Sequence, residues 1–286
     1  MKTRAMGTSG LTVSAVGLGG MPVSIDGRPS EDEGVRTIHA ALDVGVTLID
    51  TADVYCLDER DIGHNERLIA RALREKPRAD VVIATKGGLE RPGGAWTRNA
   101  RPASLRAACE RSLVALGVPR IDVYQLHAPD PTVPFADSVG ELERLRAEGK
   151  IAHVGLSNVT VHEIDAARAI VPIVSVQNRW NPLHRAPEND GVLAHCTRMG
   201  IAFLPYSPFG GTSAARSLSR VGSLAAEAKK RGISPHRLVL AWMLAKSPVV
   251  IPIPGARRSE SAVDSAAAGD IALTGDDVAT IERAFR

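Results

Sequence analysis

Residues 121–158 read IDVYQLHAPDPTVPFADSVGELERLRAEGKIAHVGLSN. Two short apolar runs, 121–127 and 151–158, flank a segment over 135–148 that has helical spacing and stops at Gly149. Short runs rich in β-branched residues are typical of strands buried on both faces, and glycine is a common helix stop. The stretch therefore predicts a strand–helix–strand unit with parallel strands.

The same pattern recurs over the whole chain. Eight short apolar runs end in a polar residue or a glycine: 13–20 (VSAVGLGG), 46–50 (VTLID), 81–86 (VVIATK), 121–127, 151–158, 173–178 (IVSVQN), 201–207 (IAFLPYS) and 249–255 (VVIPIPG). Helix signals lie between them, such as the capping-box spacing of Ser30 with Glu33 and of Thr160 with Glu163. Eight alternations of strand and helix predict a parallel sheet with helical crossovers.

Two Rossmann halves would also alternate, but their glycine fingerprint is absent. Gly17-Leu18-Gly19 runs into Met21-Pro22, so the third glycine of GxGxxG is missing. We therefore expect an α/β fold in which residues 1–286 form a single (β/α)8 TIM barrel, whose usual size is about 250 residues. Residues 1–11, with a turn at Ser9-Gly10, are expected to form an N-terminal β-hairpin that caps the barrel bottom.

Composition disfavours several classes of function. The 35 Lys and Arg residues nearly balance 32 Asp and Glu, and no basic stripe emerges, which argues against nucleic-acid binding. No apolar run is long enough to span a membrane, so no membrane partner is expected. The three cysteines are scattered without a CxxC motif, and there is no secretory start, which indicates a reduced cytoplasmic protein. We expect a monomer or weak homo-oligomer whose partner is a small molecule.

The carboxyl ends of the predicted strands carry the polar residues Asp50, Lys86 and His127, with Tyr55 five residues after Asp50. In a barrel these ends form the active face, so the four side chains are expected to meet there. Each has a structural alternative: Asp50 a turn cap, Tyr55 a rim aromatic, Lys86 a plain salt-bridge partner and His127 a core histidine.

Together the four residues predict a proton-delivery site. A tyrosine ordinarily has a pKa of about 10, and a Lys86 cation held by Asp50 would lower the pKa of Tyr55. His127 would hydrogen-bond a substrate carbonyl oxygen, and the missing attacking partner would be a hydride. Lys86 as a Schiff-base lysine is a rival, although a nearby carboxylate would keep it charged. A metal site would need ligands such as His64 or His153 beside Asp50, and none is expected.

The chain resembles the aldo-keto reductase family over nearly its whole length. The ordered matches are Gly17 to Gly20, Asp50 to Tyr55, Gly63 to Glu66, Ala84 to Lys86, Asp122 to His127, Gly155 to Asn158, Gln177, Tyr206 to Pro208, and Ile253 to Gly255. The stretch from Ile62 to Leu68 resembles bacterial members near the pyridoxal-type reductases.

The resemblance implies reduction of aldehydes and ketones, or the reverse, with Tyr55 as general acid supported by Asp50, Lys86 and His127. It also implies NADP(H) across the barrel mouth, with NAD(H) the less favoured cofactor. The cofactor residues it implies are Gly19, Ser157, Asn158, Gln177, Tyr206, Ser207, Phe209, Gly210, Gly255, Arg257 and Asp264. Asn158 and Gln177 as helix caps remain an alternative.

The adenosine end departs from the family pattern, because Ser261, Asp264 and Ser265 replace residues that often contact this part of the cofactor. Arg257 and Arg258 favour NADPH because a guanidinium matches phosphate geometry, although both could be surface charges.

The substrate pocket is expected to include Val54, Trp96 and Trp180, with simple packing in the core as an equal alternative for Trp180. The absence of a long tail after the last helix predicts an open pocket. Arg91 and Arg98 in the same loop as Trp96 could attract an anionic substrate. Two other classes of protein remain as alternatives, an NADP-binding regulatory barrel with little turnover and a Lys86 aldolase.

Overall fold

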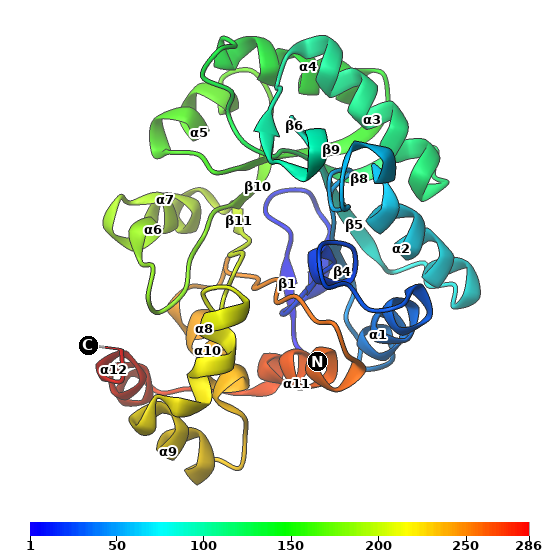
Figure 1. Cartoon of the computed structure of the whole chain (residues 1–286). Helices are drawn as coiled ribbons and strands as arrows, with labels where there is room; N and C mark the ends of the chain where they lie inside the picture. The colour runs from blue at the N-terminus through cyan, green and yellow to red at the C-terminus, as the bar shows by residue number, and fades with distance from the viewer. Residues whose placement is uncertain (286) are drawn as a thin grey trace.

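The computed structural model describes residues 1–285, and a curled parallel sheet forms its centre (Figure 1). Seven strands pair in the order β11-β10-β9-β8-β5-β4-β3. Their bounds are β3 (Leu18–Gly19), β4 (Leu48–Asp50), β5 (Val82–Gly87), β8 (Ile121–Leu126), β9 (Ile151–Ser157), β10 (Ile173–Gln177) and β11 (Ala202–Phe203). All their pairings are parallel, as the alternation of strand and helix predicts.

The eighth predicted run, residues 249–255, closes the sheet into a barrel without forming a regular strand. Val250 bridges Phe203 in β11, and Gly255 bridges Gly19 in β3 at the opposite edge. Pro252 and Pro254 have no N–H to donate to a ladder, so regular pairing cannot extend through them. Their carbonyls still accept hydrogen bonds from Gly17 and Gly19. The expected (β/α)8 barrel is confirmed, with one irregular strand.

Helices surround the barrel, as Figure 1 shows. The α-helices are α1 (Glu31–Asp43), α2 (His64–Glu75), α3 (Pro102–Leu116), α4 (Phe135–Ala147), α5 (Val161–Arg168), α6 (Ala186–Asn189), α7 (Val192–Met199), α8 (Thr212–Ser217), α9 (Gly222–Lys230), α10 (Pro235–Lys246), α11 (Ser259–Ala266) and α12 (Gly275–Arg283). Short 3₁₀ turns are η1 (Met21–Val23), η2 (Glu59–Asp61), η3 (Pro92–Gly94), η4 (Leu218–Arg220) and η5 (Ala267–Asp270). No helix in residues 1–285 is long and apolar enough to cross a membrane.

The helix ends follow the local sequence signals. Both predicted capping boxes form, at Ser30 with Glu33 and at Thr160 with Glu163. Gly117 caps α3 in the left-handed conformation, at φ 68°, which costs glycine little because it has no Cβ. These caps satisfy backbone groups that a helix leaves without partners, so they place the ends of the crossovers.

The N-terminal hairpin consists of β1 (Thr3–Ala5) and β2 (Thr12–Ser14), paired antiparallel. The run 13–20 was expected to be a barrel strand throughout, which is wrong, because Val13 belongs to the hairpin and β3 covers only Leu18–Gly19. Met6 and Val13 are buried in the apolar cluster inside the barrel. In Figure 1 the hairpin lies across the centre of the ring of helices and strands. It fills the end of the barrel that is opposite the carboxyl ends of the strands.

Candidate active site

A cavity of about 1060 Å³ lies at the carboxyl ends of the strands. The residues from the sequence prediction that line it are Gly19, Asp50, Tyr55, Trp96, His127, Ser157, Asn158, Gln177, Tyr206, Ser207, Phe209, Gly255, Arg257 and Asp264. Parallel strands all point their carboxyl ends at one edge, which is why positions so distant in the sequence meet here. The volume is large enough for an elongated cofactor together with a small substrate.

Lys86 lies fully buried beneath the cavity wall, at the end of β5. Its Nζ donates three hydrogen bonds, to Asp50 Oδ1 at 2.7 Å, to the Thr51 carbonyl at 2.8 Å and to Tyr55 Oη at 3.0 Å. An ammonium group has three donors, so all of them are used. Asp50 Oδ2 accepts further bonds from Gln177 at 2.6 Å and Gln125 at 3.3 Å. This network fixes Lys86 against the phenol of Tyr55.

Opposing effects set the protonation states in this network. Burial alone would lower the pKa of Lys86, but Asp50 and Tyr55 beside it outweigh burial and raise the pKa. Lys86 therefore stays charged, which disfavours the Schiff-base alternative. Burial raises the pKa of Tyr55, against the lowering effect of Lys86. The expectation that the pKa of Tyr55 falls below its ordinary value is thus wrong, because desolvation of the phenolate dominates.

His127 follows β8 and faces the cavity next to Tyr55, with the two ring centroids 5.9 Å apart. Burial and the Lys86 charge hold the pKa of His127 well below its ordinary value. The imidazole is therefore neutral near pH 7 and has one N–H to donate. Trp96 completes a group of three rings, at 6.5 Å from both Tyr55 and His127.

Polar side chains continue the cavity wall along β9 and β10. The Ser157 hydroxyl donates to the Gln177 carbonyl at 2.8 Å, and Asn158 Nδ2 donates to the His127 carbonyl at 2.9 Å. Tyr206 donates from its hydroxyl to Asn158 Oδ1 at 2.8 Å. Asn158 and Ser207 have φ values of 59° and 50°, and no other non-glycine residue in the described chain has a positive φ. Such backbone is costly for these residue types and is concentrated at functional sites.

The other end of the cavity is basic. Arg257 donates to the carbonyls of Pro22 and Asp26, so its guanidinium holds the loop over 21–28 against the cavity. Arg258 and Arg216 also line the cavity, and within residues 1–285 neither guanidinium group has an ion-pair or hydrogen-bond partner. Asp264 lines this end too, but Arg237 and Ser234 occupy its carboxylate.

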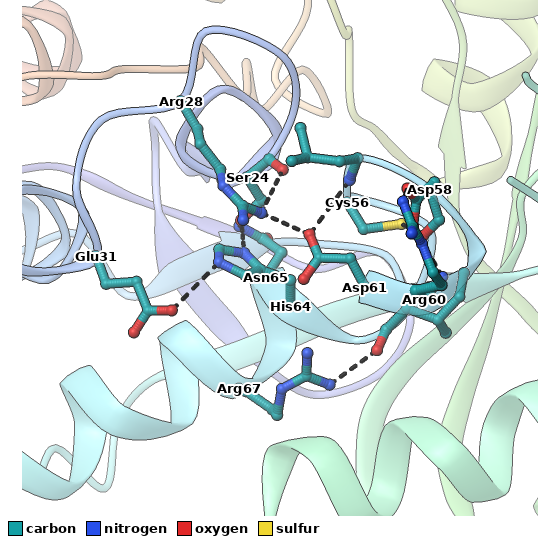
Figure 2. Close-up of polar contacts among 12 residues, drawn as sticks. Ser24, Arg28, Glu31, Cys56, Asp58, Arg60, Asp61, His64, Asn65 and Arg67 are labelled. Atoms are coloured by element: carbon teal, nitrogen blue, oxygen red, sulfur yellow. Dashed lines mark hydrogen bonds and ion pairs between the residues drawn. The ribbon is translucent and has the colours of Figure 1, made fainter. Parts of the chain in front are cut away.

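A polar cluster also holds this loop (Figure 2). Ser24 Oγ lies 2.9 Å from His64 Nδ1 and accepts a hydrogen bond from Asn65 at 2.7 Å. Arg28 pairs with Asp61 at 2.5 Å. His64 and Asn65 begin α2, so the segment from Gly63 to Glu66 anchors the cavity rim. His64 is thereby a structural residue, distant from the strand-end cluster.

Besides Lys86, which lies beneath the wall, three predicted residues do not line the cavity. Trp180 was expected to form a pocket wall, which is wrong, because it is fully buried against Phe203 and Trp242 and donates to Glu188. Val54 is also buried, in a small apolar cluster with Tyr55. Gly210 lies beside the cavity, and the neighbouring Gly211 takes its place in the wall.

Sequence reasoning missed several residues of the site. Gln125 contacts Asp50, and its position in β8, two residues before His127, is a signal that both side chains point to the same face. The cavity wall also includes Met21, Pro22, Leu89, Gly211, Arg216 and His236. These residues lie in short or irregular elements and at helix starts outside the barrel strands, where strand periodicity does not indicate the direction of a side chain. Within residues 1–285, no group of three His, Cys, Asp or Glu residues is arranged to hold a metal.

Comparison with known proteins adds independent information. A model of the aldo/keto reductase family matches residues 15–286. An uncharacterized oxidoreductase of Schizosaccharomyces pombe is 36% identical over 278 residues, covering 95% of this chain and 87% of the relative. The glycerol dehydrogenase of Gluconobacter oxydans aligns with a TM-score of 0.84 at 30% identity, covering 99% and 94% of the two chains. An aldo-keto reductase of Klebsiella pneumoniae, solved with NADPH, aligns with a TM-score of 0.82 at 28% identity, covering 99% and 95%.

Proposed function

Because the chain belongs to the aldo/keto reductase family, we propose that it reduces aldehydes or ketones to alcohols, or catalyses the reverse reaction, with NADP(H) as cofactor. One observation carries the proposal: Lys86, paired with Asp50, donates a hydrogen bond to Tyr55 at the wall of a large cavity. The phenol oxygen accepts from Lys86, which leaves the phenol proton of Tyr55 available to a substrate.

The residues of the cavity fit a dinucleotide. Amide side chains at Asn158 and Gln177 offer donors and acceptors near Tyr55, and the ring of Tyr206 offers a stacking surface. The unpartnered Arg216 and Arg258, together with Arg257, offer positive charge at the other end, where phosphates would lie. When bound, the nicotinamide supplies or accepts a hydride.

The chain's own residues then account for the proton. A carbonyl oxygen placed between Tyr55 and His127 would accept hydrogen bonds from the phenol and from the neutral imidazole. Tyr55 releases its proton as negative charge builds on that oxygen. The Lys86 ammonium stabilises the resulting phenolate, and Asp50 keeps Lys86 in position. In alcohol oxidation the same groups work in reverse, so Tyr55 must first lose its proton.

The test is NADPH oxidation measured with a panel of aldehydes, including pyridoxal, sugars and quinones. We expect turnover with several members, since the cavity is open to solvent at the Trp96 side. Tight NADPH binding without turnover of any carbonyl would instead favour the regulatory barrel. Borohydride trapping of a carbonyl compound on Lys86 would favour the aldolase, a reaction that the charged state of Lys86 opposes.

A further inference from the structure

Arg91 lies directly behind the wall of the proposed substrate pocket, in the loop between β6 (Leu89–Glu90) and β7 (Thr97–Arg98). Its guanidinium carbon lies 4.0 Å from the centre of the Trp96 ring, and Trp96 lines the cavity. The Trp96 ring centre is 6.5 Å from those of Tyr55 and His127. The guanidinium is thus one aromatic ring away from the place where a carbonyl would react.

The charge of Arg91 is buried, and within residues 1–285 it makes no ion pair. The residue is 6% exposed, and its Nη2 donates to the carbonyls of Cys56 and Leu57 at 3.1 and 2.9 Å. Nε and Nη1 are buried without hydrogen-bond partners among residues 1–285. In that part of the chain no carboxylate lies within ion-pair distance of Arg91 either. A buried cation without a counter-ion is costly unless an anion or other acceptor joins it.

The carboxylates around this loop have other partners, although the charge of Arg91 still acts on Asp58. Glu59 accepts a hydrogen bond from the backbone N–H of Gly93. Asp58 is held by Arg60 at 2.6 Å, and Asp61 is held by Arg28, as Figure 2 shows. Asp50 is bonded to Lys86. No carboxylate among residues 1–285 forms an ion pair with Arg91, so part of its positive field remains at the Trp96 wall. Because low-dielectric surroundings weaken screening, this field acts on a group inside the cavity.

From this geometry we infer that Arg91 makes the pocket selective for carbonyl substrates that carry a negatively charged group, such as a carboxylate. The inference rests on the proposed reductase function and adds the substrate class. Arg98, in β7 at the end of this loop, is exposed, and its guanidinium has no hydrogen bond or ion pair within the described chain, so it provides a matched control for bulk charge.

The experiment compares 4-carboxybenzaldehyde with 4-formylbenzamide, which have similar shapes and reactive groups but differ in charge. The unmodified protein is expected to show at least a tenfold higher kcat/KM for the carboxylate. Arg91→Met should abolish this preference while leaving the amide within about twofold, and Arg91→Lys should retain part of it. Arg98→Met should behave as the unmodified protein does.

Three results would overturn the inference: no preference in the unmodified protein, an equal loss for both aldehydes in Arg91→Met, or the same loss of preference in Arg98→Met. The first needs no variant, so it decides the matter even if Arg91→Met does not fold. If neither aldehyde is reduced, the proposed function fails. Quenching of tryptophan fluorescence then still measures whether the protein binds the carboxylate more tightly than the amide, and equal binding would overturn the role of Arg91.

Discussion

The ammonium group of Lys86 lies 3.0 Å from the phenol oxygen of Tyr55 and donates to it, while burial raises the pKa of that phenol. In the proposed reaction, burial and Lys86 would have different roles in proton transfer. Burial keeps Tyr55 protonated near neutral pH, as a general acid for carbonyl reduction must be. Lys86 stabilises the phenolate only when it forms, which is the form of assistance that accelerates a reaction.

Replacement of Tyr55 by phenylalanine tests this division directly. Tyr55→Phe keeps the ring but removes the proton, so kcat for aldehyde reduction should fall by about 10²–10⁴-fold, while NADPH binding persists. Stopped-flow measurement of NADPH oxidation and a fluorescence titration of NADPH binding check the two parts. Near-normal turnover by Tyr55→Phe would show that another group supplies the proton.

The buried ion pair predicts different effects on stability and activity. Lys86→Met leaves Asp50 buried without its cation, which should lower the free energy of unfolding by about 3–5 kcal/mol. The double variant Lys86→Met with Asp50→Asn removes the unpaired charge, so it should regain much of that stability without regaining turnover. Urea unfolding and kcat, measured on the same preparations, separate the effects. Recovery of activity in the double variant would contradict the role given to Lys86.

Most of the barrel could be predicted from the sequence because its helix ends and buried strands are indicated by residues that are neighbours in the chain. Capping boxes such as Ser30 with Glu33 involve neighbouring residues, and short buried runs identify strands without knowledge of their partners. The errors occurred where pairing decides the structure. Val13 has the same apolar character as a barrel strand, but it pairs with Arg4 in the hairpin instead. The run 249–255 pairs at both edges although Pro252 and Pro254 prevent a regular ladder.

The residues of the site also differ in whether local sequence or distant contacts decide their positions. Asp50, Lys86 and His127 were predictable because barrel topology brings strand ends together, whatever surrounds them. Trp180 was not, because its partners Phe203 and Trp242 come from distant segments, and they bury it away from the cavity. The direction in which the pKa of Tyr55 shifts depends on how deeply the phenol is buried. The spacing of Tyr55 from Asp50 in the sequence does not reveal that depth. Arg257 and Arg258 are neighbours in sequence, but only the structure distinguishes their contacts.

The two arginines should affect cofactor binding differently. The guanidinium of Arg258 has no partner in the described chain and is free to meet the 2′-phosphate, so Arg258→Ala should weaken NADPH binding by about tenfold or more and NADH binding little. Arg257→Ala should weaken both cofactors, because it also releases the loop over 21–28. Dissociation constants from fluorescence titrations decide this. Equal losses of NADPH and NADH affinity in Arg258→Ala would mean that Arg258 does not touch that phosphate.

A buried carboxyl close to Tyr55 should make stability depend on pH. Asp53 is fully buried, its carboxyl oxygens have no hydrogen-bond partner within residues 1–285, and Arg111 lies 3.5 Å away. Burial, with the charge of Glu66, raises the pKa of Asp53 to about 8 although Arg111 opposes this. In the unfolded chain the pKa of an aspartate is about 4, so between these values the folded protein binds the extra proton.

The stabilising contribution of the protonated carboxyl is therefore complete below about pH 4 and is lost as pH rises through about 8. Asp53→Asn removes this titration and should flatten the fall in the free energy of unfolding between pH 5 and 8, by up to about 1.4 kcal/mol per pH unit. Urea unfolding at several pH values measures the slope. Asp26→Asn, at an exposed carboxyl, is the control and should keep the slope of the unmodified protein. Parallel curves for Asp53→Asn and the unmodified protein would show that Asp53 is ionised in the folded state across this range.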